Sequence, residues 1–345
     1  MEQPGHRPPR NATIHVLAAL TLVGVTAGCS ATADADPEPE QSADLTARLL
    51  TRVSPVHEEI GMALLEGPTF DADGRLVVVD VTAPAGEPKV WRVDTDSQEV
   101  EPVFTDDAGV YTSAQFSPFD DRLYLTDFAG GRIVSITPEG EDETVFFSEE
   151  VDGTRMHPDD LAFDEAGNMY VSDSLGFDAP AWEARGRVVR IDRESAEATV
   201  LAEELPAPNG ISFDEDFAGL WVGQYAANRV DYYALNEEGT EVESSHTALH
   251  FDGGRSRIDS IAVDAGGNLY QAVHGQPSIF VYSSTGEHLG TVTVPSEAAE
   301  GLDTATNVAI KPGTTDAYMT VSGNDGGFVY TFDALDEGIR QSNGG

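Results

Sequence analysis

The sequence has very little cysteine and few basic residues. Cys29 is the only cysteine among 345 residues, so no disulfide can form within the chain. Lysine and arginine total 19 against 61 aspartates and glutamates, a net charge of −42. Such a field repels the phosphates of nucleic acids and anionic lipid headgroups, so we expect neither as a partner. The acidity is typical of a solvated surface, for example in a salt-rich habitat, and is not by itself evidence for a metal site.

Helical periodicity and the common hydrolase motifs are also missing. Between residues 56 and 335 almost no segment keeps a helical hydrophobic period over 11 residues. There is no GxSxG motif, which disfavours a serine hydrolase of the α/β type. There is no HExxH motif or cysteine cluster, and the eight histidines are scattered, which disfavours zinc.

The N-terminus has the pattern of a bacterial export signal. Arg7 and Arg10 precede an apolar run at residues 14–25, which ends in VTAGCS and is too short for an ordinary membrane-spanning helix. A Gly-Cys pair at this place resembles a lipobox, so we expect residues 1–28 to be removed and Cys29 to be lipidated. The alternative is a plain signal peptide with an incidental cysteine. Residues 29–50, polar and acidic at first, are expected to be a flexible spacer. The mature protein would then be exported and held at the extracytoplasmic face only by its lipid anchor.

The rest of the chain repeats one unit of strand, turn and strand. Each unit joins a β-rich run to a turn such as DADG, DEAG or DAGG, and further short strands follow each hairpin. The units begin at Phe70, Phe116, Phe163, Phe213, Val263 and Ile310, which are 46 to 50 residues apart. Three or four short strands at this period are typical of a β-propeller blade. We therefore predict an all-β, six-bladed β-propeller with four-stranded blades over residues 51–338, a tail at 339–345, and a monomer. The last strand should need an N-terminal strand to close the ring.

One position of the repeat carries polar side chains throughout. Counting back four residues from each start gives Glu66, Thr112, Asp159, Asn209, Asp259 and Thr306. We expect these side chains just ahead of the innermost strands, around one mouth of the central channel; Asp259 and Ser260, for example, precede a strand predicted at 261–263. A ring of oxygen atoms suits a hard cation such as Ca²⁺. Loops before strands are often polar, however, so the repetition alone leaves the metal site open.

Four segments resemble the blade motifs of the senescence marker protein, gluconolactonase and luciferin-regenerating enzyme family. They are EGPTFDADGRLVVVD, PDDLAFDEAGNMYVSD, PNGISFDEDFAGLWVGQ and IDSIAVDAGGNLY, and the resemblance covers about residues 59–335. It implies a channel calcium held by Glu66, Asn209 and Asp259, with Ser260 beside Asp259 and Asp159 as a fourth contributor. It also implies that Asp259 is catalytic through proton transfer, although Asp259 could be a ligand only.

The lactonase subgroup of that family implies a second calcium, for which Asp152, Thr154 and Asp159 are the candidates. The loop that would hold it, VDGTRMHPDD, is one residue shorter than expected. Two further side chains have open roles: His274 after the fifth hairpin, and Trp182 in the longest loop, which could form a substrate lid.

The sequence thus favours a calcium-dependent hydrolase acting on a small-molecule lactone or related cyclic ester. A non-catalytic propeller, stabilised by calcium and binding a ligand or a partner protein, is the main alternative. Phosphotriester hydrolysis at the same calcium is a third.

Overall fold

The computed structural model describes residues 44–342. Within this range the chain is built from strands, and its only helical segments are two short 3-10 turns, η1 (Ala181–Glu183) and η2 (Tyr225–Ala227). No helix in this part of the chain is long and apolar enough to cross a membrane. The predicted signal peptide, Cys29 and most of the spacer lie outside the described residues, as do residues 343–345 of the predicted tail.

Four sheets have four antiparallel strands each. The first contains β3 (Leu65–Phe70), β4 (Leu76–Asp80), β5 (Pro88–Val93) and β6 (Val100–Thr105). The second contains β7 (Tyr111–Phe116), β8 (Leu123–Asp127), β9 (Arg132–Ile136) and β10 (Thr144–Phe147). The third contains β11 (Pro158–Phe163), β12 (Met169–Asp173), β13 (Gly186–Ile191) and β14 (Ala198–Leu205). The fourth contains β15 (Pro208–Phe213), β16 (Gly219–Gln224), β17 (Arg229–Leu235) and β18 (Val242–His250).

The remaining strands form one nine-stranded sheet. It contains β19 (Arg257–Val263), β20 (Leu269–His274), β21 (Ser278–Tyr282), β22 (His288–Thr293), β23 (Thr304–Ile310), β24 (Asp316–Gly323), β25 (Gly326–Asp333), β1 (Leu45–Thr46) and β2 (Arg48–Ser54). One residue pair, Val273 with Ala305, joins β20 to β23. Strand β2 pairs antiparallel with β25, so an N-terminal strand does complete the last sheet, as predicted.

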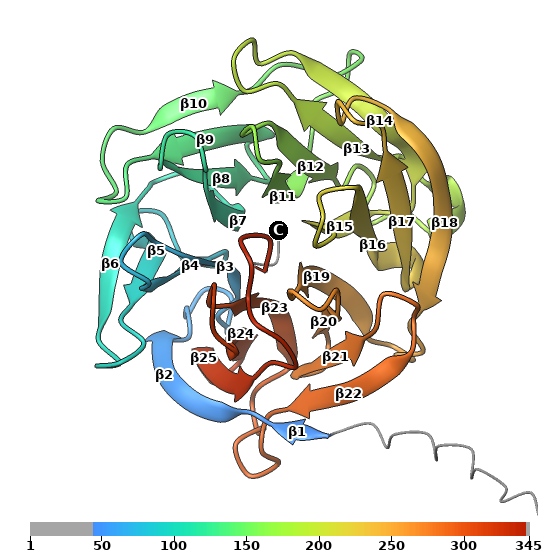
Figure 1. Ribbon diagram of the computed structural model, residues 1–345. Coiled ribbons are helices and arrows are strands. Elements are labelled where there is room, and N and C mark those ends of the chain that lie inside the picture. The colour runs from blue at the N-terminus through green and yellow to red at the C-terminus, as the bar shows by residue number, and fades with distance from the viewer. Residues whose placement is uncertain (1–43, 343–345) are drawn as a thin grey trace, which may run out of the picture. The chain divides into compact units, whose positions relative to one another are not determined.

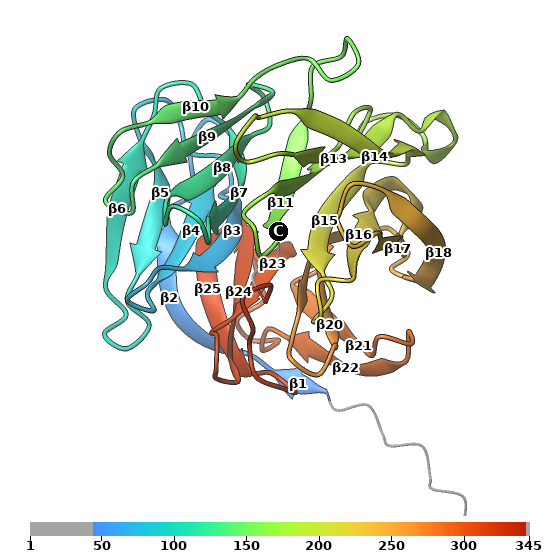
Figure 2. The same cartoon turned by 45° about the horizontal axis from the view of Figure 1, so that its top comes forward.

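The sheets surround a common centre, as in a β-propeller (Figures 1 and 2). The innermost strands contact one another in the cyclic order β3, β7, β11, β15, β19, β23 and back to β3. The all-β prediction is confirmed. The sheet count is four four-stranded sheets plus a larger one rather than six separate sheets.

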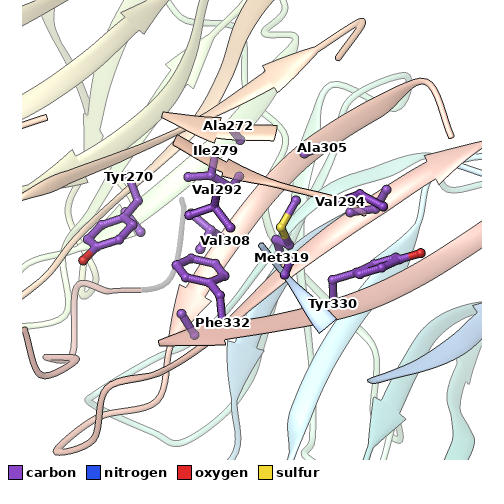
Figure 3. Packing of buried hydrophobic residues seen from close by; sticks show 14 of the residues in the cluster. Tyr270, Ala272, Ile279, Val292, Val294, Ala305, Val308, Met319, Tyr330 and Phe332 are labelled. Atoms are coloured by element: carbon purple, nitrogen blue, oxygen red, sulfur yellow. The ribbon is translucent and has the colours of Figure 1, made fainter. Parts of the chain in front are cut away.

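The core lies between neighbouring sheets. Figure 3 shows one such layer, where Tyr270, Ile279 and Val292 of β20–β22 pack near Met319 and Phe332 of β24 and β25. Because each sheet is covered on both faces, strands such as β4, β8 and β12 are buried at every residue instead of alternating. A further cluster joins β2, β3 and β4 to β23–β25 and so closes the circle of packing.

Aspartates and glycines build the hairpin turns. Asp164 Oδ1 accepts the backbone N–H of Asn168 at 2.8 Å, and Asp264 Oδ1 accepts that of Asn268 at 2.9 Å. Gly167 (φ +88°) and Gly267 (φ +74°) then supply the left-handed backbone that these turns require. The predicted turns DEAG and DAGG are confirmed.

The innermost strands begin earlier than predicted. Strand β19 starts at Arg257, not at residue 261, so Asp259 and Ser260 lie inside the strand. The reason is a break in register between Ile258 and Ile261, where Asp259 and Ser260 together oppose a single residue of β20, so that β19 has one extra residue. The other innermost strands have an irregularity at the same place, so the predicted polar ring lies on strand bulges rather than in loops.

The C-terminal segment covers the end of the channel where the hairpin turns lie. Arg340 Nη2 donates to the carbonyl of Asp164 at 3.1 Å, and Ser212 Oγ donates to the carbonyl of Gln341 at 3.2 Å. Ser342 Oγ donates to the carbonyl of Val263. Residues 340–342 of the predicted tail therefore hydrogen-bond to three different sheets.

Candidate functional site

A cavity of about 240 Å³ opens at the other end of the channel. Five of the six predicted ring positions line it: Glu66, Thr112, Asp159, Asn209 and Asp259. Thr306 is not among the lining residues. It is fully buried, and its hydroxyl bonds the carbonyl of Leu65 and the hydroxyl of Thr320 instead. The repeat position therefore brings most, but not all, of its members to one site.

Asp159 lies against side chains from β15 and from the end of β12. Its Oδ2 accepts hydrogen bonds from Ser174 Oγ at 3.0 Å and from Asn209 Nδ2 at 3.1 Å. Burial and the nearby charge of Asp259 nevertheless raise the pKa of Asp159 to about 7. The other end of the Asn209 amide is different, because Asn209 Oδ1 is buried and has no hydrogen-bond partner.

Glu66 is a second perturbed carboxylate of the set. Its pKa is raised well above the ordinary value by burial first, and then by the charges of Asp259, Asp160 and Asp159. A 3.5 Å hydrogen bond from Asn307 Nδ2 acts in the opposite direction. Four carboxylates thus repel one another across a small buried volume, which a cation would stabilise.

Asp259 lies on the β19 bulge, and a side chain of the neighbouring strand β20 stabilises the backbone of this bulge. Gln271 Nε2 donates to the carbonyls of Asp259 at 2.9 Å and Ser260 at 3.2 Å. On the cavity side, His274 Nδ1 lies 3.5 Å from Asp259 Oδ2, and this contact raises the pKa of His274. His274 therefore lines the cavity as a partner of the predicted catalytic residue.

Ser260 does not line the cavity with Asp259. Its side chain is almost fully buried and hydrogen-bonds to Asp160, the residue after Asp159. Burial first, and then Asp159, raise the pKa of Asp160 well above its ordinary value, and Asp160 Oδ2 is buried without a hydrogen-bond partner. Asp160 and Ser260 form a buried polar pair, and sequence reasoning did not single out Asp160.

Asp152 and Thr154 are also absent from the cavity lining. They belong to a turn in which Val151 and Thr154 exchange backbone hydrogen bonds, and Asp152 lines a separate cavity with Glu149 and Glu150. The second calcium stays a prediction, and the structure does not bring its three candidates to one cavity. Trp182 is 84% exposed and does not line the cavity either.

A second set of lining residues was missed. These residues lie at the end of the second strand, or just after it, in five of the six hairpins: Val81, Phe128, Ser174, Tyr225 and His274. Apart from His274, none was a candidate in the sequence. Their common place in the repeat, 11 or 12 residues after each start, is the signal that could have found them.

The donor set suits a hard cation. Glu66, Asp159 and Asp259 supply carboxylates, and the unpartnered Asn209 Oδ1 is a buried amide oxygen of the kind that calcium accepts. In residues 44–342 no three His, Cys, Asp or Glu side chains are grouped as a metal cluster by themselves. A metal site here would therefore need the Asn209 amide oxygen as a ligand in addition to the carboxylates. The roles of these residues as ligands, and of Asp259 in catalysis, stay predictions.

The sequence matches the model of one protein family, described as the SMP-30/gluconolactonase/LRE-like region, over residues 64–323. The chain belongs to this family. Among curated proteins similar to this chain, lactonase drp35 of Staphylococcus aureus strain MRSA252 is 26% identical over 285 residues, covering 80% of this chain and 85% of the relative. Lactonase drp35 of Staphylococcus saprophyticus is 27% identical over 282 residues, covering 79% and 84%.

Solved structures agree with the family's fold. A gluconolactonase from Xanthomonas campestris superposes with a TM-score of 0.65 at 18% identity, covering 86% of this chain and 99% of that chain. A calcium-binding protein, regucalcin, from Agrobacterium tumefaciens strain C58 superposes with a TM-score of 0.67 at 15% identity, covering 87% and 99%. At these identities the likeness shows the fold alone.

Proposed function

We propose that this chain is a calcium-dependent hydrolase that opens lactones or related cyclic esters. The observation that carries the proposal is the oxygen-only set of Glu66, Asp159, Asn209 and Asp259 in one cavity, with Asn209 Oδ1 buried and unpartnered. The names of the staphylococcal relatives support the substrate class.

The chemistry needs an electrophile and a proton acceptor at one place. Bound calcium would polarise the ester carbonyl and stabilise the oxyanion. In this proposal Asp259, which lines the same cavity, takes a proton from the water that adds to the carbonyl carbon. His274, whose pKa is raised by its contact with Asp259, then gives a proton to the alkoxide that leaves when the ring opens.

The test is a hydrolysis screen over aliphatic, aromatic and sugar lactones, with and without a chelator. We expect turnover that needs calcium and that is lost in Asp259→Asn. The exposed Asp216→Asn is the matched control, because Asp216 lies on a turn at the far end of the channel. Calcium affinity measured by calorimetry separates two roles: it falls with activity if Asp259 is only a ligand, and is largely kept if Asp259 moves the proton.

The non-catalytic alternative makes a different prediction. Calcium would then raise the melting temperature, and the calcium-loaded protein would hydrolyse no lactone in the screen. That result would count against the proposed function.

The proposal also includes the number of blades and the location of the protein. We infer six blades, counting the nine-stranded sheet as two blades that touch at the Val273–Ala305 pair. We also infer export through residues 1–28 and anchoring by lipid at Cys29, on the sequence pattern alone. Mass spectrometry of the membrane fraction would test the anchor, since Cys29→Ser should release the protein.

A further inference from the structure

The mouth of the cavity is divided into a polar half and an apolar half. The first two sheets contribute Leu64 and Val81, and then Val110 and Phe128. All four lie directly before an innermost strand or directly after the strand beside it, so they surround the entrance. At the end of the second strand or just after it, the remaining sheets carry Ser174, Tyr225 and His274 instead, and all three are polar.

Phe177 extends the apolar half. It lies in the loop between β12 and β13, and its backbone N–H bonds the carbonyl of Ser174 at 3.0 Å. Its ring meets Phe128 edge to face, with centroids 5.4 Å apart, and Phe128 also contacts His157 at 5.4 Å. Phe128 is thus held between two rings, whereas Phe177 remains 49% exposed. An exposed aromatic ring at a cavity mouth has apolar surface left to cover.

The lining charges restrict the ligand further. Among the described residues that line this cavity are three carboxylates and no lysine or arginine. A substrate bearing a phosphate or a carboxylate would meet no cation from the chain, while a neutral ester meets no such penalty. The ester carbonyl of the substrate would contact bound calcium in the polar half of the cavity.

Polyhydroxylated lactones fit the mouth poorly. A sugar lactone carries hydroxyls around its ring, and those facing Leu64, Val81, Val110 and Phe128 would lose water without finding a hydrogen-bond partner. An alkyl or aryl substituent at the same place would bury apolar surface instead. The cavity, about 240 Å³, has the volume of roughly eight water molecules, enough for a small lactone ring with a short side chain.

We propose that Phe128 and Phe177 are specificity-determining residues that select neutral lactones with an apolar substituent over sugar lactones. This inference rests on the proposed function. The carbonyl is placed at the carboxylates, and the substituent lies along Val81, Val110 and the two phenyl rings.

Kinetics on a chain-length series test the proposal. The calcium-loaded full chain is assayed on δ-valerolactone, its alkyl-substituted homologues up to δ-decalactone, and glucono-δ-lactone. We expect kcat/KM to rise about fourfold for each methylene that the apolar half covers. In Phe177→Ala the ratio of kcat/KM for δ-decalactone to that for δ-valerolactone should fall about tenfold. Trp182→Ala is the matched control, because Trp182 is on the same loop and outside the cavity, and it should keep the ratio.

Binding of lactams separates this inference from the proposed activity. Piperidin-2-one and 6-pentylpiperidin-2-one imitate the two lactones without being hydrolysed, so calorimetry measures their affinities whether or not the chain is a lactonase. The pentyl compound should bind more tightly, and Phe177→Ala should remove that gain. Equal affinities for the two lactams, or glucono-δ-lactone as the preferred substrate, would overturn the inference and leave the proposed function intact. If the protein hydrolysed no lactone but still bound the pentyl lactam more tightly than piperidin-2-one, only the proposed function would be rejected.

Discussion

In metal-free protein, raising the pH from 5 to 8 should lower the free energy of unfolding, because Asp159 must lose a proton inside the folded cavity. The pKa of this carboxyl is about 7 in the folded chain against an ordinary value of 3.8. Between these values the folded state binds a proton that the unfolded state releases, so stability falls as the pH rises through this window and levels off above pH 7. Over the whole window a difference of about three pKa units corresponds to about 4 kcal/mol, of which about 3 kcal/mol is lost between pH 5 and pH 8. The raised pKa of Glu66 acts in the same direction.

Urea denaturation in the presence of a chelator, repeated at several pH values, measures this loss. Asp159→Asn removes the titrating group and should flatten the profile, so the variant gains a few kcal/mol on the wild type at pH 8 and almost nothing near pH 4. Asp216→Asn should keep the wild-type slope, since Asp216 is exposed. If Asp159→Asn and the wild type lose stability in parallel between pH 5 and 8, the reasoning about Asp159 is wrong.

Calcium should couple to the same proton. With a pKa of about 7, roughly nine-tenths of the Asp159 carboxyls are protonated at pH 6, so calcium binding should release about one proton there. Calorimetry in buffers with different ionisation enthalpies counts that proton. Calcium affinity should rise about 90-fold from pH 5 to pH 8 on account of this group alone.

Three other perturbations have defined outcomes. Glu66→Gln should weaken calcium binding by roughly 10- to 100-fold in calorimetry while the far-ultraviolet circular dichroism stays unchanged, since it removes one buried carboxylate. Gly210→Ala should destabilise the chain by about 1–3 kcal/mol in urea, because the new Cβ would lie 2.7 Å from the carbonyl oxygen of Asp259; unchanged stability would mean that the bulge moves freely. Deleting residues 340–345 should remove the hydrogen bonds across the far end of the channel and cost about 3–5 kcal/mol at about 1 kcal/mol each. Calcium affinity at the other end should not change in that deletion.

The ring of candidate ligands could be predicted from the sequence because repeats place equivalent residues at equivalent points around a channel. Glu66, Asp159, Asn209 and Asp259 were found in this way, and they do line one cavity. Their location inside strands was not predictable, because a bulge interrupts the alternation of inward and outward side chains by which a strand is recognised. This is why the predicted strand at 261–263 began four residues too late.

The entrance of the cavity could not be predicted for a different reason. Its residues share a position in the repeat but not a chemical type, as Phe128, Ser174 and His274 illustrate. Strand β2 was equally hard to identify, because its outer face is exposed and its partners are far away in the chain, as Ser54 pairs with Gly327. Only the assembled ring decides that β2 lies beside β25.

The pairing of β2 with β25 also constrains the order in which the protein folds. Closing a loop of 273 residues costs about 5 kcal/mol in chain entropy, and this contact cannot form until the last strand has been synthesised. Strand β2 must therefore stay unpaired until β25 has been synthesised, which predicts slow folding governed by long-range contacts. A chain shortened past Ser54 would leave β25 as an open edge, ready to pair with the same edge of another copy.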